Sequence, residues 1–531
     1  MLETRLERGI SKQMENQQQA AQQGVALPMI VLILATFMSV LDTTIINVSI
    51  PKMMSVFGVG TSDIQWVVTA YSLVVGALVP ITGYLGDNFG YKRIFVYSVI
   101  LFTIGSALCG MAWNNNAMII FRILQAIGGG AIMPVAMAMM FRLFPPERRG
   151  LSMGIFGIAI MFAPAFGPTL GGYITEYLDW RLIFYINVPI GILDTLLALM
   201  VLQEFKQDEK KRFDFFGFLT SSAGFASLLY GLGIVGDKGW TDIEVIFYIS
   251  VGLCCLVLFV LIEFIVEHPM IDLRVMKNSM FTISLVISSI ASIALFASLF
   301  LLPVFLQNIS GLSAVETGLV LLPQGIAAGI MMPISGMLFD KFGVKWLAIT
   351  GLTITAYSFY LIQSLDIATS FSTVSWWLII RAIGIGSVMM PVSTAGMNTV
   401  PMQNLGQASA LTNTVRQVSS AFGIAWLSNL LSERQFYHVT INSEQMPVGG
   451  YAVTSALSQL SQFYSSGGLT GNLANSAATS WLMSQLQKVS TVQAMDDVFW
   501  VVTWVVIVAI VFAFFLKDTK APRGEKPVIM E

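Results

Sequence analysis

Long apolar runs dominate this sequence and restrict its fold more than any other feature. Each is about 20 residues long, the length at which an α-helix crosses the hydrocarbon core of a bilayer. Because lipid offers no hydrogen bonds to an exposed backbone, such runs fold as spanning helices. The sequence therefore predicts an all-α polytopic membrane protein with 14 transmembrane helices. These lie near residues 28–50, 63–84, 94–112, 117–140, 151–173, 182–202, 215–235, 243–265, 281–307, 314–338, 346–364, 373–398, 405–430 and 497–516.

Charged residues are scarce and lie mostly between the runs. They make up 11% of the chain, against about 25% in a soluble domain, and the net charge of -2 provides no basic surface for nucleic acid. Of the 28 Lys and Arg residues, 20 fall in the tails and the even-to-odd loops, 5 in the other loops and 3 inside runs. Basic residues concentrate on the cytoplasmic side of membrane proteins. We therefore expect 1–27 and 517–531 to be cytoplasmic tails of a multi-pass protein of the cell inner (cytoplasmic) membrane.

The sequence carries no pattern typical of a metal centre or a nucleotide site. Its histidines, His268 and His438, lie between apolar runs, and the Walker pattern GxxxxGK[ST] is absent. The cysteines, Cys109, Cys254 and Cys255, lie inside apolar runs without a CxxC spacing. We expect no cofactor, no metal and no enzymatic activity.

Two pairs of similar segments indicate an internal repeat. The loops "PITGYLGDNFGYK" (80–92) and "PISGMLFDKFGVK" (333–345) share eight of thirteen positions at an offset of 253 residues. Two runs beyond each loop, "RILQAIGGGAIMP" (122–134) is matched by "RAIGIGSVMMP" (381–391). Halves related by internal repeats are typical of transporters. The predicted units are two six-helix halves, 28–202 and 279–516, a linker with two extra helices, 203–278, and a long extracytoplasmic loop, 431–494.

Five segments resemble motifs of one transporter family. They are "LDTTIINVSIP" (41–51), "GYLGDNFGYKR" (83–93), "RILQAIGGG" (122–130), "APAFGPTLGG" (163–172) and "WRLIFYINVPIG" (180–191). The sequence resembles the major facilitator superfamily, and within it the 14-span drug:proton antiporters of the EmrB/QacA type. The resemblance covers the chain apart from the tails and most of 431–494. It implies the major facilitator fold, proton coupling near the fourth span and export.

Ionisable side chains inside apolar runs are costly and mark functional sites by default. At a rise of about 1.5 Å per residue, Asp42 and Arg122 lie at similar depth below the same membrane face, so they can pair if both face inward. Such a pair can couple protonation to conformation, or it can be a fixed ion pair that holds helices in register. Asp194 is a candidate second acid for protons or cationic substrates, or a partner for Arg416 or another polar group. Arg381 and Arg416 can contact substrate or make structural pairs inside the bundle.

The glycine-rich motifs are candidates for moving parts. The family resemblance makes the repeated loop a cytoplasmic gate, and the alternative is a short turn. Its residues are Gly83, Asp87, Gly90, Lys92, Arg93 and Asp340, and the two aspartates can accept hydrogen bonds from the N-terminus of a neighbouring helix. Small residues permit close helix crossing and a proline permits a kink. The segment "APAFGPTLGG" resembles the antiporter motif of the family, and we expect it to be a pivot between the halves or a packing contact alone. The residues of this antiporter motif are Gly167, Pro168, Gly171 and Gly172.

Together these features predict a proton-coupled secondary antiporter that exports hydrophobic or amphipathic drugs, which is multidrug efflux. The alternatives are an exporter dedicated to one metabolite, such as an antibiotic, a fatty acid or a siderophore, or a non-transporting membrane receptor or membrane-embedded enzyme. The expected partners are a small lipophilic substrate, protons and the lipid bilayer. Apolar stretches in 431–494 can form interfacial helices that dock a periplasmic adaptor protein or act as a passive outer cap.

Overall fold

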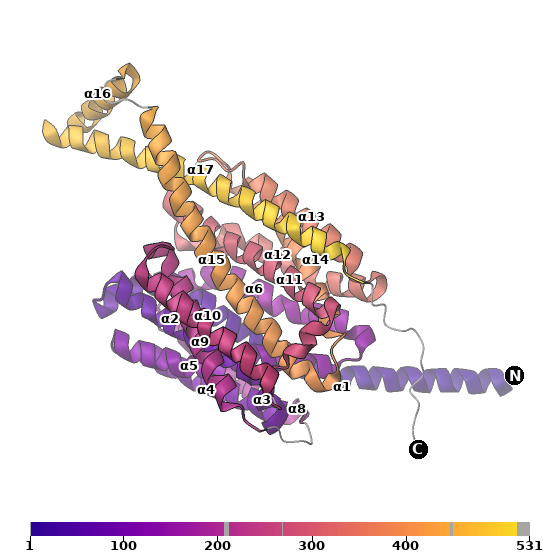
Figure 1. The fold of residues 1–531 in the computed structure, drawn as a ribbon. Coiled ribbons are helices and arrows are strands. Elements are labelled where there is room, and N and C mark those ends of the chain that lie inside the picture. Colours follow the sequence, from indigo (N-terminus) through magenta and orange to yellow (C-terminus); the bar gives the residue numbers. More distant parts are fainter. Residues whose placement is uncertain (1, 207–211, 268, 446–449, 518–531) are drawn as a thin grey trace.

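A computed structural model describes residues 2–206, 212–267, 269–445 and 450–517, and Figure 1 shows its helices. The first group of helices precedes residue 202. It contains α1 (Leu2–Phe57), α2 (Thr61–Leu78), η1 (Val79–Ile81), α3 (Thr82–Phe89), α4 (Tyr91–Gly110), α5 (Asn115–Leu143), η2 (Pro146–Arg148), α6 (Arg149–Tyr177), α7 (Leu182–Tyr185) and α8 (Asn187–Val201).

Two intermediate helices, α9 (Phe215–Lys238) and α10 (Ile243–Ile265), separate the first group from the second. The second group follows the short helix η3 (Leu273–Lys277). It contains α11 (Ser279–Val304), η4 (Phe305–Ile309), α12 (Ala314–Phe342), α13 (Lys345–Ile362), α14 (Phe371–Met397), η5 (Met402–Asn404), α15 (Leu405–Glu444), α16 (Tyr451–Ser466) and α17 (Asn472–Phe514).

Twelve helices of the described chain are long and apolar enough to cross a membrane. The number of 14 from the sequence is therefore not confirmed. Helices α13 and α15 occupy the positions of the two remaining predicted spans but are not among the twelve. Polar residues dilute the apolar composition of both: α13 begins at Lys345, and α15 carries Arg416 and Arg434. Each nevertheless packs inside the second group, α13 against α14 and α17, and α15 against α11 and α17.

Four segments predicted as loops or a tail are largely helical in the described chain. The first repeated loop, 80–92, is mostly η1 and α3, and its second copy, 333–345, lies in α12 as far as Phe342. Their polar residues lie at helix ends against neighbouring helices, and the turns themselves are confined to the positive-φ glycines Gly90 and Gly343 and their neighbours. The described parts of 431–494 are the extensions of α15 and α17 with α16 between them, and these helices project from the bundle (Figure 1). From Leu2 onward, the predicted tail 1–27 forms the first part of α1.

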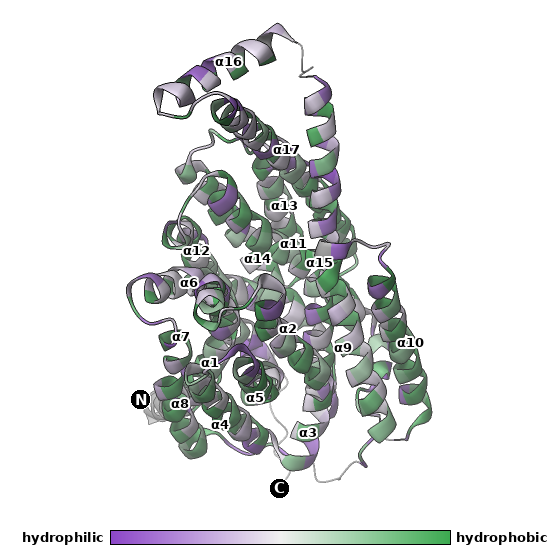
Figure 2. Cartoon of the chain, turned by 90° about the vertical axis from the view of Figure 1, so that its left-hand side faces the viewer, coloured by the Kyte–Doolittle hydropathy of each residue, from purple (hydrophilic) through white to green (hydrophobic). Residues whose placement is uncertain are grey.

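Helix α6 joins the two groups by running along α12 from Gly150 to Gly172. Helix α9 bridges them on another side, since it contacts both α2 and α15. The outward surface of α10 is almost wholly apolar (Figure 2), and it exposes Phe247, Leu253 and Leu261. An apolar surface of this extent requires a cover such as lipid.

Candidate functional site

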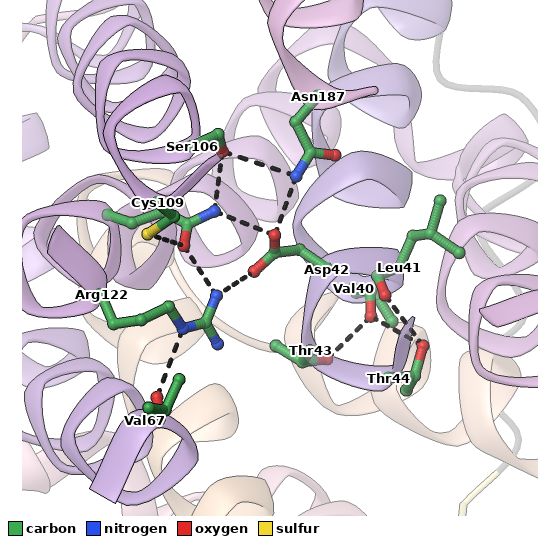
Figure 3. Close-up of polar contacts among 11 residues, drawn as sticks. Val40, Leu41, Asp42, Thr43, Thr44, Val67, Ser106, Cys109, Arg122 and Asn187 are labelled. Atoms are coloured by element: carbon green, nitrogen blue, oxygen red, sulfur yellow. Dashed lines mark hydrogen bonds and ion pairs between the residues drawn. The ribbon is translucent and has the colours of Figure 1, made fainter. Parts of the chain in front are cut away.

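Asp42 and Arg122 form an ion pair inside the first group of helices (Figure 3). Nη1 of Arg122, on α5, donates to Oδ2 of Asp42, on α1, over 2.6 Å. Each residue is 1% exposed. The pairing expected from their similar depth is therefore present in the structure. An ion pair this buried is stable only if its other hydrogen-bonding groups are also satisfied.

Polar side chains from two helices, α5 and α8, satisfy the second carboxylate oxygen. Oδ1 of Asp42 accepts from Nε2 of Gln125 at 2.9 Å and from Nδ2 of Asn187 at 2.8 Å. Both amides also reach Oγ of Ser106 on α4, at 2.7 Å from Gln125 and 3.5 Å from Asn187. The network thus ties α1 to α4, α5 and α8.

The guanidinium of Arg122 has further partners on α2 and α5. Nη1 donates to Oε1 of Gln125 at 2.7 Å, and Nε donates to the carbonyl oxygen of Val67 at 3.4 Å. The guanidinium carbon lies 4.1 Å from the ring centroid of Tyr71, a cation–π distance. Protonation of Asp42 would remove the charge that holds Arg122 in this position. The position of Arg122 on α5 therefore depends on the charge of Asp42 on α1.

The antiporter motif packs α6 against α1 directly after Asp42. A Cβ added at Gly167 would meet the side chain of Thr44, and one added at Gly171 would lie 2.8 Å from the carbonyl oxygen of Ile45. Gly172 faces α12 instead, where a Cβ would lie 3.1 Å from Val315. The close helix crossing predicted from these small residues is present, and Pro168 lies inside the continuous helix α6.

The first copy of the repeated motif lies at the end of α3, against α4, α5 and the start of α15. Oδ1 of Asp87 accepts from the hydroxyl of Tyr91 at 2.9 Å and lies 3.4 Å from Nη2 of Arg142. A Cβ on Gly83 would stand 3.0 Å from the backbone nitrogen of Gln407. This copy therefore brings the first group against the N-terminus of α15.

The turn after α3 is fixed by Glu204, which follows α8. Gly90 has a φ of 98°, a conformation that favours glycine. Oε1 of Glu204 accepts from the backbone N–H of Lys92 at 3.0 Å, and its Oε2 lies 3.8 Å from Nε of Arg93. Nζ of Lys92 donates to the carbonyl oxygen of Leu199 at 2.7 Å. These basic residues thus connect α4 to the end of α8.

The second copy joins α12 to the N-terminus of α6. Oδ1 and Oδ2 of Asp340 accept from the backbone N–H groups of Gly150 and Leu151, each at 2.9 Å. This is the helix-capping contact expected from the sequence. A carboxylate at this place also complements the positive end of the helix dipole. Close by, Nη1 of Arg149 donates to Oδ1 of Asn398, at the end of α14, over 3.0 Å.

The remaining ionisable candidates are not part of the Asp42 network. Asp194, on α8, is fully buried and neither carboxylate oxygen has a hydrogen-bond partner in the described structure. Arg416 donates to Oδ1 of Asn413 at 2.5 Å and contacts Sδ of Met133 at 2.7 Å. The predicted alternative of an Asp194–Arg416 pair is therefore wrong for this structure. Arg381 is buried on α14 and bonds to Gln324.

Several residues of the site were not predicted from the sequence. Gln125 lies one turn after Arg122, a spacing that places two side chains on one helix face, and it was therefore detectable. Asn187 lies in the motif "FYINVPIG" but is not ionisable, so a search for charges passes over it. Glu204 was predicted only as part of the linker 203–278.

The sequence was compared with known proteins. Residues 32–424 match the model of the Major Facilitator Superfamily. The chain is 37% identical over 506 residues to the uncharacterized MFS-type transporter YhcA of Bacillus subtilis, with 94% of both chains covered. It is 35% identical over 404 residues to the multidrug transporter protein MdtP of the same organism, with 76% of this chain and 74% of MdtP covered.

The fold was compared with solved structures. The proton:xylose symporter XylE superposes with a TM-score of 0.58 at 15% identity, over 94% of this chain and 97% of XylE. At this identity the likeness concerns the fold alone. The chain is a multi-pass membrane protein that belongs to the Major Facilitator Superfamily of transporters, which are not enzymes.

Proposed function

We propose that the protein is a proton-coupled antiporter that exports hydrophobic or amphipathic compounds across the cytoplasmic membrane. The observation that carries this proposal is the buried Asp42–Arg122 pair, whose atoms are 2.6 Å apart. A carboxylate that has a charged partner, and that lies beside the α1–α6 crossing at Thr44 and Ile45, can exchange its proton as the helices move. The export of drugs is supported by the name of the relative MdtP and by the antiporter motif.

We also infer that both termini are cytoplasmic and that α13 and α15 span the membrane with the other twelve helices. In this topology the Asp340–Gly150 and Arg149–Asn398 contacts close the cytoplasmic side. Residues 28–202 and 279–516 are then the moving halves, and the linker 203–278 carries the two extra helices. The projecting segment 431–494 lies outside the cell, as an outer cap or as a docking place for an adaptor protein.

We propose the following roles for the candidate residues. Asp42 carries the proton, and Arg122 controls how readily Asp42 takes it up. Asp194 and Arg416 belong to the proton or substrate path. The Gly83 to Arg93 segment and Asp340 form the gate. The glycines of the antiporter motif allow α6 to move on α1 and α12.

Transport by purified protein in liposomes tests this function. With an imposed pH gradient, the wild type should move ethidium against its concentration gradient. Asp42→Asn should abolish the dependence of this transport on the pH gradient. The matched control is Asp179→Asn, because the side chain of Asp179 is 57% exposed outside the network. Undiminished gradient-driven transport by Asp42→Asn would show that Asp42 does not carry the proton. Transport by the wild type that does not depend on the pH gradient would refute the proposed antiport.

A further inference from the structure

Arg381 is a buried arginine whose hydrogen bonds are incomplete. It lies on α14, is 2% exposed, and donates through Nη2 to Oε1 of Gln324 on α12. Its Nε and Nη1 atoms have no hydrogen-bond partner among the described residues. A buried charge is costly unless it is paired and hydrogen-bonded. Arg381 is therefore a donor group in need of an acceptor.

The internal repeat allows the partners of Arg381 to be compared with those of Arg122. Arg381 begins the segment that matches the one beginning at Arg122. In the first copy, Asp42 neutralises the arginine, and Gln125 and the carbonyl of Val67 accept further hydrogen bonds. In the second copy a neutral amide, Gln324, is the only hydrogen-bond acceptor that the described structure gives the guanidinium. One copy thus supplies its own anion and the other copy does not.

A small cavity lies beside Arg381, where the two groups of helices meet. Its volume is about 30 Å³, which holds about one water molecule. Apart from Arg381 and Gln324 its walls are apolar, and no acidic side chain lines it. The lining residues come from α6, α11, α12 and α14; they are Met161, Pro164, Ala165, Leu295, Leu299, Gln324, Gly325, Ala328, Arg381, Ala382 and Ile385.

The cavity is closed on one side by the contact between α6 and α12. A Cβ on Gly325 would overlap the side chain of Ala165, so the two helices touch at the cavity wall. Separation of α6 from α12 would enlarge the cavity and leave Arg381 at its base. An apolar pocket with one charged group is the usual form of a site for an amphipathic ligand.

We propose that Arg381 binds the carboxylate of an amphipathic anion whose apolar part lies against Leu295, Leu299 and Met161. The guanidinium is the side chain best suited to carboxylates, because its N–H groups match their oxygens. This proposal names a substrate class for the exporter, and its transport aspect rests on the proposed function. The binding itself does not require proton coupling.

Binding of a matched pair of probes tests the proposal. The probes are 1-pyrenebutyrate and its methyl ester, which share the apolar part and differ in the carboxylate. Binding to detergent-purified protein is followed by pyrene fluorescence. The wild type should bind the acid at least about tenfold more tightly than the ester, as expected for a charge-assisted hydrogen bond. Equal affinity of the wild type for both probes would overturn the proposal without any variant.

Two substitutions at Arg381 then assign the preference. Arg381→Gln should abolish it, while Arg381→Lys, which keeps the charge, should retain part of it. The control is Arg434→Gln on the projecting part of α15, where the side chain is 46% exposed, and it should behave like the wild type. A preference that survives in folded Arg381→Gln would overturn the proposal, and so would a preference lost in Arg434→Gln.

Transport measured in parallel separates this proposal from the proposed function. Gradient-driven ethidium transport by a protein that does not prefer the acid would refute the carboxylate site and leave the antiporter intact. An acid preference that depends on Arg381, in a protein whose transport ignores the pH gradient, would refute proton coupling and support the site.

Discussion

Asp340 accepts a hydrogen bond from the backbone N–H of Gly150 at 2.9 Å, so the end of α12 caps the beginning of α6. These residues are 190 positions apart and belong to different helix groups. A Cβ on Gly336, one turn before Asp340, would overlap the backbone of Gly150. The carboxylate and the glycines thus form one contact, which must separate whenever the groups part at this end.

We therefore predict that Asp340→Ala opens this end of the bundle. Loss of the cap should raise the labelling rate of a reporter cysteine at Met332 by several-fold, because that position is fully buried between α12 and α6. The measurement is labelling by N-ethylmaleimide in a background that lacks Cys109, Cys254 and Cys255. The exposed Asp366, beyond the other end of α13, provides the control Asp366→Ala. Equal rates in both variants would show that Asp340 does not hold the contact closed.

The Asp42–Arg122 pair should show strong coupling in a double-mutant cycle. Arg122→Gln leaves a buried carboxylate without its charged partner, and we expect it to lower the free energy of unfolding by about 3–5 kcal/mol. Adding Asp42→Asn removes that orphaned charge and should restore much of the stability. The quantity to measure is unfolding in detergent by circular dichroism. Additive effects of the two substitutions would mean that the pair contributes little as a unit.

The antiporter glycines should tolerate no side chain on the face that meets α1. In Gly171→Ala the new methyl group would lie 2.8 Å from the carbonyl oxygen of Ile45, and overpacking of this kind costs about 1–3 kcal/mol. We expect a lower unfolding midpoint and slower transport, since α6 is displaced beside Asp42. Gly233→Ala on α9 is the matched control, because no atom lies within 4 Å of its Cβ position. Equal loss in both variants would point to a general helix effect.

The sequence allowed the helical fold, the family and the central ion pair to be predicted, because hydropathy and rare charges are local signals. Asp42 and Arg122 were found in this way. Neutral partners such as Asn187 carry no such signal, and their role depends on the packing of α8 against α1. The repeated motif was recognised from its residues, but its helical state was missed, since polarity at a helix end resembles that of a loop.

Asp194 should be a residue that lowers stability. Its carboxylate is fully buried on α8 and has no hydrogen-bond partner in the described chain, so folding removes it from water without compensation. Asp194→Leu, of similar shape, should therefore raise the free energy of unfolding by about 1–3 kcal/mol. Asp194→Asn keeps the shape and the polarity but cannot exchange a proton, and we expect it to slow gradient-driven ethidium transport. Thermal unfolding and liposome transport measure the two effects separately. A destabilised Asp194→Leu would reveal a partner that stabilises the carboxylate, and an Asp194→Asn variant with full transport would exclude Asp194 from the proton path.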